Sequence, residues 1–393
     1  MLALANPVQD YAWGAVDGLA RLVGTPPTDG PEAELWVGAH PAAPSTTAGD
    51  RPLDQVVDED PEGLLGPTVV ARHGARLPYL LKVLAIGAPL SIQLHPSARQ
   101  AADGFAREEA AGLARDDPRR SYRDPRAKPE VLVALVPTWV MAGFRSGSDA
   151  ARALGPLADH PAVARLRDRV ADEPDARSAL VDLLAAPEEA RTALAAAAAA
   201  TDPGAGPEMR WVAALAEAYP GDPTALAPAL LALRRLEVGE GLFLPAGVPH
   251  AYLQGAGVEL MGASDNVVRG GLTPKHVDRD ELVRLLAPPG TGPVALPGEP
   301  GPDGATTTYA PGAPELALHR TALGPDPVAL PALPGGPALV LALGGTAALE
   351  VGEQVVELGR GRAALVAAGE RSAARISGAG TAWWATVGPE QAG

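Results

Sequence analysis

The chain has 393 residues, of which 47% are hydrophobic and 20% are charged, so it can bury more than one sizeable core and two or three domains are expected. It contains no cysteine, which excludes disulfides, thiolate metal ligands and cysteine nucleophiles. The formal net charge of -15 disfavours nucleic acid and anionic membrane surfaces as partners.

The first predicted elements, up to about residue 147, are short apolar strands bounded by Pro and Gly, such as 79–84 and 131–136. From 148 to 236 the composition shifts to Ala, Leu, Arg and Glu. Because Ala is the best helix former, the Ala-rich tract 193–200 is also predicted to be helical. Apolar residues recur there with helical spacing: Leu154, Leu157, Val163, Leu166 and Val170.

Strand and turn composition returns at about residue 237. Within 239–250, a glycine turn, three apolar residues, a Pro-x-Gly turn and His250 predict the inner hairpin of a small β-barrel, with the histidine facing inward. Pro and Gly are dense from 288 to 304, which predicts a linker. We therefore expect a mainly β fold with a helical insert, divided into residues 1–147 and 237–288 as two parts of one domain, 148–236 as a helical domain, and 289–393 as a C-terminal β domain.

Three separated segments offer metal ligands in strand-like settings. Gln93 and His95 are two residues apart, so in a strand they point to the same face and can converge on one ion. Glu130 starts an apolar run after a proline, and His250 ends the segment described above. Two imidazoles, a carboxylate and an amide suit zinc, while Mn, Fe or Co are equally compatible by ligand type. Each residue alone also fits an ordinary structural role, and no spacing rule joins the four.

The remaining histidines lack such settings, and we expect them to have surface or structural roles: His40, His73, His160, His276 and His319. Lysine is rare, because only three of the 32 basic residues are lysine. Where arginine is used almost everywhere, a lysine can mark a position that needs a compact ammonium group, although chance retention is the alternative. The three are Lys82, Lys128 and Lys275.

Eight short motifs follow one another along the chain: QDYAWG at 9–14, ELWVG at 34–38, LKVL at 81–84, QLHP at 93–96, KPE at 128–130, MAGFR at 141–145, PAGVPHAY at 245–252 and SDNVVRGGLTPK at 264–275. In these motifs the chain resembles type I mannose-6-phosphate isomerases over roughly residues 6–280. The resemblance implies a metal-bearing cupin jelly-roll barrel, interrupted by an all-α domain and followed by a second cupin-like barrel. Two departures stand out: little can be matched after about residue 300, and Ala12 replaces a residue that is acidic in some relatives.

The resemblance also implies the residues of the site. Zinc would be bound by Gln93, His95, Glu130 and His250, and Arg269 would be catalytic. The substrate would be a phosphorylated hexose, with mannose 6-phosphate and fructose 6-phosphate interconverted. The expected substrate-binding residues are Lys275, Lys82, Ser91, Trp13 and Asp265.

An aldose–ketose interconversion moves a proton between adjacent carbons through an enediolate. It needs a base, stabilisation of the developing oxyanion and exclusion of water. Glu259, which alternates inward on the strand before Arg269, is the candidate acid/base if burial raises its pKa. Arg269 would stabilise the enediolate or position the substrate. The phosphate would be held by Lys275, Lys82 or Ser91, and Lys128 would assist proton transfer.

Other classes of protein remain as alternatives. A non-catalytic sugar-phosphate-binding cupin would keep the fold without turnover. An iron-dependent cupin oxygenase commonly uses two histidines and one carboxylate, which leaves Gln93 and the lysines unexplained. A fused nucleotidyltransferase would need a glycine-rich phosphate loop, which we do not find. No signal peptide or membrane-spanning run is visible, so we expect a cytoplasmic protein that is monomeric.

Overall fold

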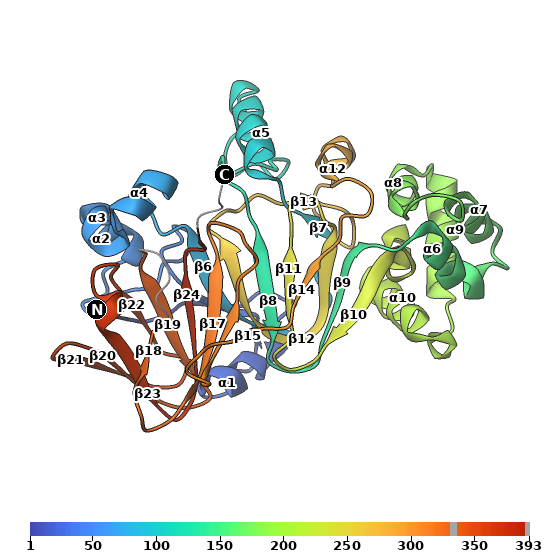
Figure 1. Cartoon of the computed structure of the whole chain (residues 1–393). Coiled ribbons are helices and arrows are strands. Elements are labelled where there is room, and N and C mark those ends of the chain that lie inside the picture. The colour runs from blue at the N-terminus through green and yellow to red at the C-terminus, as the bar shows by residue number, and fades with distance from the viewer. Residues whose placement is uncertain (331–335, 390–393) are drawn as a thin grey trace.

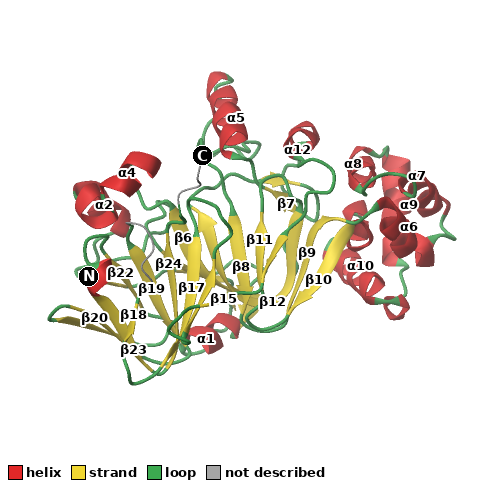
Figure 2. Ribbon diagram, viewed as in Figure 1, coloured by secondary structure: helices red, strands yellow, loops and turns green. Residues whose placement is uncertain are grey.

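Antiparallel sheets form the centre of the molecule and helices cover its ends, as seen in the computed structural model, which describes residues 1–330 and 336–389 (Figures 1 and 2). The fold is mainly β. Its larger sheet has 11 strands. Seven follow one path, in the order β14 (Val294–Leu296), β11 (Gly241–Leu244), β8 (Glu130–Ala134), β12 (His250–Gly262), β6 (Tyr79–Ile86), β5 (Glu34–Val37) and β2 (Val8–Gln9). Four more pair off this path: β7 (Gln93–Leu94), β9 (Thr138–Phe144), β10 (Leu231–Leu236) and β13 (Val268–Arg269).

A second sheet of seven strands lies beside the first and is built mostly from the C-terminal part of the chain (Figure 1). Its order is β1 (Leu2–Leu4), β22 (Ala363–Val366), β19 (Ala338–Leu343), β24 (Gly380–Thr386), β17 (Ala317–Leu323), β16 (Thr306–Tyr309) and β15 (Glu299–Pro300). A four-stranded sheet holds β18 (Val328–Ala329), β23 (Ala374–Gly378), β20 (Ala347–Val351) and β21 (Gln354–Leu358). β3 (Ala15–Val16) and β4 (Pro31–Glu32) form a separate two-stranded antiparallel sheet.

Alternation along the strands explains how these sheets pack. In β6, Leu81 and Val83 belong to the core shared with the seven-stranded sheet, whereas Lys82 and Leu84 point to the opposite face. β8 and β12 repeat this pattern, with Val131, Val133, Val258 and Leu260 in the shared core. Trp383, Leu339 and Leu341 meet them from the other sheet. Burying one face between two sheets therefore leaves the other face of the same strands to line a site.

Helices occupy the residues between β9 and β10, where the helical spacing was recognised. All five apolar residues of that pattern are buried, and the Ala-rich tract lies in α9 (Glu188–Ala199), so both helix predictions are confirmed. These helices share a core with residues of β9 and β12 and gather at one end of the molecule (Figure 2). The others are α6 (Gly147–Leu154), α7 (Pro161–Val170), α8 (Arg177–Ala185), α10 (Pro207–Ala218) and α11 (Ala227–Leu230).

The remaining helices lie around the sheets: α1 (Gly18–Val23), α2 (Leu53–Glu59), α3 (Pro61–Leu65), α4 (Pro67–His73), α5 (Ala98–Ala110) and α12 (Arg279–Leu285). Figure 1 shows α5 and α12 above the same edge of the larger sheet, near β7 and β13. Ser97 caps α5 in a capping box with Gln100. Across the described residues, no helix is both long and apolar enough to cross a membrane.

Two sequence predictions about this region are wrong in detail. β11 and β12 do not form a hairpin, because β8 lies between them and pairs with both. The stretch from 288 to 304 is not only a linker, since β14 extends the larger sheet and β15 extends the seven-stranded sheet. Edge strands tolerate proline, because their outer backbone groups need no partner.

Candidate metal centre and active site

Three potential metal ligands converge from segments that are far apart in the sequence. Glu130 is the first residue of β8, His250 is the first residue of β12, and His95 directly follows β7. The pairing of His250 with Gln93 brings β7 alongside β12. The ligand atoms of His95, Glu130 and His250 lie within 4.8 Å of one another, and all three residues are buried.

Backbone carbonyls fix both imidazoles in one tautomer. Nδ1 of His95 lies 2.8 Å from the carbonyl oxygen of Asn266, and Nδ1 of His250 lies 3.0 Å from that of Val248. A carbonyl only accepts, so each Nδ1 carries a proton and each Nε2 is the nitrogen left to bind a metal. The Nε2 atoms of His95 and His250 lie 3.1 Å and 3.2 Å from the two carboxylate oxygens of Glu130.

This arrangement fits a divalent cation. Burial lowers the pKa of His95 to about 4, so the ring is neutral at pH 7, and its buried Nε2 has no hydrogen-bond partner. Burial alone would raise the pKa of Glu130, but His95 and Lys128 hold it well below its usual range. A divalent cation would satisfy the two Nε2 atoms and the carboxylate together. Two imidazoles whose Nδ1 atoms are hydrogen-bonded to backbone carbonyls and one carboxylate form a typical metal-binding set.

Gln93 lines the same cavity as Glu130 and His250. Its amide nitrogen lies 3.4 Å from the hydroxyl of Ser91, so the amide oxygen, the atom that ligates metals, is not used in this contact. Lys128 also belongs to this cavity, with its Nζ 3.0 Å from Glu130. The structure thus places the four sequence-predicted ligands, together with Lys82 and Lys128, in a single region.

A buried group of charges adjoins the ligands on the site-facing side of β5, β6 and β12. Nζ of Lys82 lies 3.2 Å from Glu34 and 3.5 Å from Glu259, and it sits 4.9 Å from the centre of the Trp36 ring. Strand register explains these contacts, because Lys82 is directly opposite Glu259 on one side and Trp36 on the other. Burial acts to lower the pKa of Lys82, but Glu34 and Glu259 reverse this, so the ammonium form is stabilised.

Glu259 has the ionisation behaviour that a general base needs. Burial and then the nearby charge of Glu130 raise its pKa to about 7, although Lys82 acts in the opposite direction. The hydroxyl of Tyr252 donates a hydrogen bond of 3.0 Å to Glu259. A carboxyl group with this pKa exchanges protons readily near neutral pH.

The remaining expected residues lie nearer the surface. Trp13 packs on the apolar residues beneath the site and stacks with Tyr11, with 6.1 Å between ring centres. The Asp265 side chain is 45% exposed, and its Oδ1 lies 3.4 Å from Nε2 of His40. His40 is buried against Trp36. It therefore has a structural position, next to the expected substrate-binding residue Asp265. His319 is buried in the seven-stranded sheet, and His276 is exposed.

Arg269 and Lys275 form a part of the site distinct from Lys82. Arg269 lies in β13, in register with Gln93 of β7. Burial and then Arg269 lower the pKa of Lys275, which shows that the two cations are close. Neither lines the cavity that is lined by Lys82, Ser91, Gln93, Glu130 and His250.

Sequence reasoning did not select several residues that the structure places at the site: Glu34, Tyr252, Asn266, His40 and Arg123. Glu34, Tyr252 and Asn266 lie inside the motifs at 34–38, 245–252 and 264–275, so the motifs contained a signal for them. His40 and Arg123 are flanked by such motifs but lie outside them.

The fold and the site define a metal-centred enzyme of the phosphomannose isomerase type. Residues 1–147 match the family model described as "Phosphomannose isomerase type I, catalytic domain". Mannose-6-phosphate isomerase of Salmonella typhimurium is 38% identical over 97% of this chain and 98% of its own length. That of Escherichia coli is 43% identical over 72% of this chain and 74% of its own, and the Homo sapiens enzyme is 31% identical over 81% of each.

Solved structures agree with the sequence relatives. A crystal structure of mannose 6-phosphate isomerase bound with zinc and yttrium has a TM-score of 0.86 and 34% identity, covering 99% of both chains. The Salmonella typhimurium enzyme bound to fructose 6-phosphate and zinc is equally similar, with a TM-score of 0.86 and 34% identity. The chain belongs to the mannose-6-phosphate isomerase family.

Proposed function

We propose that this chain interconverts mannose 6-phosphate and fructose 6-phosphate with a bound zinc ion. The observation that carries the proposal is the convergence of the Nε2 atoms of His95 and His250 on the carboxylate of Glu130, next to a buried carboxyl group, Glu259, whose pKa is about 7. The solved relatives that contain zinc and fructose 6-phosphate support this choice of metal and substrate.

The ligands would be Gln93, His95, Glu130 and His250. When bound, the ion would supply Lewis-acid polarisation of the sugar oxygens at carbons 1 and 2. Manganese, cobalt and iron suit the same donor atoms, so the choice of zinc rests on the relatives.

Proton transfer would be carried out by residues of the chain. Glu259 takes the proton from carbon 2 of the open-chain aldose, which gives an enediolate, and returns a proton to carbon 1 to give the ketose. Lys82 and Tyr252 hold the Glu259 carboxyl group in place. Arg269 stabilises the negative charge of the enediolate, and the Lys128 ammonium assists proton transfer at the sugar oxygens.

Substrate contacts would extend outward from this centre. Ser91 and Lys82 lie in the inner cavity, whereas Trp13, Asp265 and Lys275 lie toward the surface. A hexose phosphate placed with its carbonyl end at the ligands would direct its phosphate toward the outer residues. Buried Lys82 already faces two carboxylates, so Lys275 is the better phosphate ligand of the two.

The proposal includes the architecture and setting of the enzyme. The 11-stranded sheet and the seven-stranded sheet would each belong to a cupin-like jelly roll. Residues 1–147 and 237–288 would form the catalytic domain, residues 148–236 an all-α domain, and residues 289–393 the C-terminal domain. β1 joins the C-terminal sheet, which ties the first and last parts of the chain together. A monomeric, cytoplasmic enzyme is consistent with the absence of cysteine and with a small anionic substrate.

The test is the reaction itself. The purified protein is incubated with mannose 6-phosphate in D₂O, and the product is identified by NMR. We expect fructose 6-phosphate with deuterium at carbon 1, because the proton passes through a base that exchanges with solvent. A zinc-loaded protein that binds the sugar phosphate without converting it would instead support the non-catalytic cupin.

A further inference from the structure

Arg123 forms a group of like charges with Arg269 and Lys275 at the outer side of the site. Within residues 1–330 and 336–389, no ion pair or side-chain hydrogen bond is made by any of the three. The loop that carries Arg123 is hydrogen-bonded to Asn266 and Val267, the residues that lead directly into β13 and Arg269. In agreement with this geometry, burial and then Arg123 lower the pKa of Arg269, and burial, Arg269 and then Arg123 lower the pKa of Lys275. In a protein with a net charge of -15, a group of unpaired positive charges indicates an anion-binding site.

The backbone geometry around Arg123 is fixed by Asn266, which is completely buried. Oδ1 of Asn266 accepts hydrogen bonds from the backbone nitrogens of Arg123, at 2.8 Å, and Asp124, at 3.2 Å. Its Nδ2 donates to the carbonyl oxygens of Asp124, at 2.7 Å, and Arg126, at 2.8 Å. Because the Asn266 carbonyl also accepts from the ring of His95, one residue ties the Arg123 loop to a metal ligand.

The same loop is held from its other side by α5. The Glu108 carboxylate accepts from the backbone nitrogens of Ser121, at 3.0 Å, and Tyr122, at 2.9 Å. The Tyr122 hydroxyl donates to Glu281 of α12, which is itself buried. Arg123 therefore extends from a backbone that is already ordered, and this lowers the entropic cost of holding an anion.

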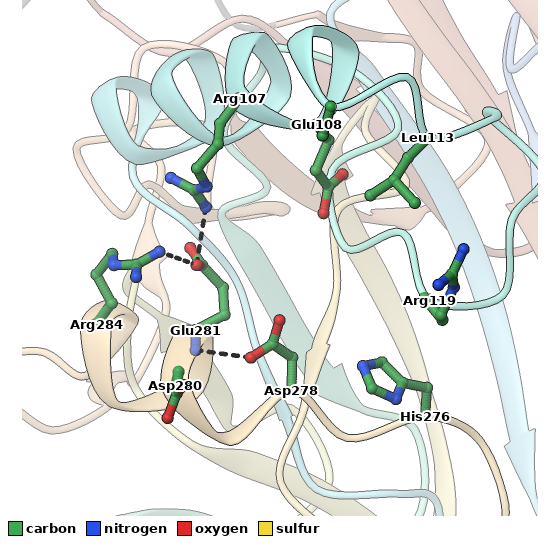
Figure 3. Close-up of a pocket in the computed structure, with 10 residues that line it drawn as sticks. Arg107, Glu108, Leu113, Arg119, His276, Asp278, Asp280, Glu281 and Arg284 are labelled. Carbon is green, nitrogen blue, oxygen red and sulfur yellow. Dashed lines mark hydrogen bonds and ion pairs between the residues drawn. The ribbon is translucent and has the colours of Figure 1, made fainter.

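An adjacent hollow between α5 and α12 provides a contrast (Figure 3). Figure 3 shows Arg107 and Arg284 both directed at the carboxylate of Glu281, and Arg107 lies 2.8 Å from it. Arg119, on the other side of the hollow, lies 2.7 Å from Asp117. These arginines have carboxylate partners of their own, so the hollow has no comparable excess of positive charge.

The lysines of the inner cavity are also neutralised. Lys82 faces Glu34 and Glu259, and Lys128 faces Glu130. Asp265 lies close enough to Arg123 to feel its charge, but no carboxylate oxygen approaches Arg123 within 4.0 Å among the described residues. The outer group is therefore the stronger attractant for a dianion.

We infer that Arg123, which no motif of the sequence selected, binds the phosphate of the substrate together with Lys275. The inference rests on the proposed function, because it places the phosphate of mannose 6-phosphate at the outer end of the site. Guanidinium groups bind phosphate through two parallel hydrogen bonds, which suits Arg123 to this role.

The experiment compares Arg123→Ala and Arg123→Lys with the wild-type protein. Arg119→Ala is the matched control, because it removes an arginine of the same surface segment that already has a carboxylate partner. For each zinc-loaded protein, the affinities for fructose 6-phosphate and inorganic phosphate are measured by calorimetric titration. The KM and kcat for mannose 6-phosphate are measured in parallel, and zinc content and thermal unfolding confirm that each variant is folded.

We expect Arg123→Ala to weaken the binding of both anions and to raise KM by about 10- to 100-fold, which is the loss of one charge-assisted contact. Arg123→Lys should recover part of the affinity, and Arg119→Ala should match the wild type. Unchanged affinities in Arg123→Ala, or a fall in kcat alone, would overturn the inference. If the wild type binds both anions but fails to convert mannose 6-phosphate, the proposed function fails while the binding comparison still decides the role of Arg123.

Discussion

Replacing Glu259 by Gln separates the chemistry of the site from its stability. Gln keeps the size of the side chain and an oxygen that can accept the hydrogen bond from Tyr252. Lys82 keeps Glu34 as a partner at 3.2 Å, so no buried charge is left alone. Loss of a general base typically slows a reaction by about 10²- to 10⁴-fold, and we expect kcat for mannose 6-phosphate to fall in this range.

The same substitution is expected to stabilise the metal-free fold at alkaline pH. A pKa that rises from 4.5 in the unfolded chain to about 7 in the folded one costs about 3 kcal/mol once the carboxyl group ionises. Between these pH values the folded state binds more protons, so this stability is complete below pH 4.5 and is lost as the pH rises through 7. The amide introduced by Glu259→Gln does not titrate, so the variant should lose this pH dependence.

Urea unfolding of chelator-treated wild type and Glu259→Gln at pH 5 and pH 8.5 measures the effect, alongside kcat for both zinc-loaded proteins. Glu34→Gln is the control, because it removes the other carboxylate partner of Lys82 and leaves the proposed base in place. It should retain clearly more turnover than Glu259→Gln. Near-normal kcat in Glu259→Gln would show that Glu259 is not the base, and the same fall in stability with pH as the wild type would show that Glu259 is not the group that titrates.

Three further predictions follow from particular residues. Arg269→Ala should leave the zinc content intact while kcat falls about 10²- to 10³-fold. Near-normal turnover would show that Arg269 is not a catalytic residue. Asn266→Ala deletes the four side-chain hydrogen bonds to the Arg123 loop. It should lower the free energy of unfolding by about 3 kcal/mol or more, and it should lower the affinity for zinc by about tenfold. An unchanged urea midpoint and unchanged competition with a chelator for zinc would contradict this. Burial and then Arg371 lower the pKa of His319 to about 3, so stability present above pH 6.5 is lost as the pH falls toward 3. His319→Leu should unfold at lower pH than the wild type, and an identical acid transition would show that this histidine is not responsible.

Local patterns singled out the segments that carry the candidate ligands, but only the resemblance to a family joined the four residues into one set. Glu130 follows a proline at the start of an apolar strand, and His250 follows two turns and a short strand. The sequence singled out Lys82 because it is one of only three lysines and lies within an apolar run. Its role became clear only from strand register, which places Glu259 on one side and Trp36 on the other.

The errors and omissions concern contacts between distant segments. Spacing along the chain predicted a hairpin of β11 and β12, but it gave no indication that β8, from much earlier in the sequence, lies between them. Glu34 is a buried carboxylate in an apolar strand, and its presence there is explained only by the ammonium group on the neighbouring strand. Asn266 is similarly explained only by the loop that it holds.

Metal dependence of turnover is the sharpest test of whether this chain is a zinc-dependent isomerase. The protein is stripped of metal with a chelator, its metal content is measured, and mannose 6-phosphate isomerisation is followed in a coupled assay before and after zinc or manganese is added back. We expect activity to disappear with the metal and to return at about one zinc ion per chain. Full turnover by the metal-free protein would contradict it, as would a zinc-loaded protein that fails to convert mannose 6-phosphate.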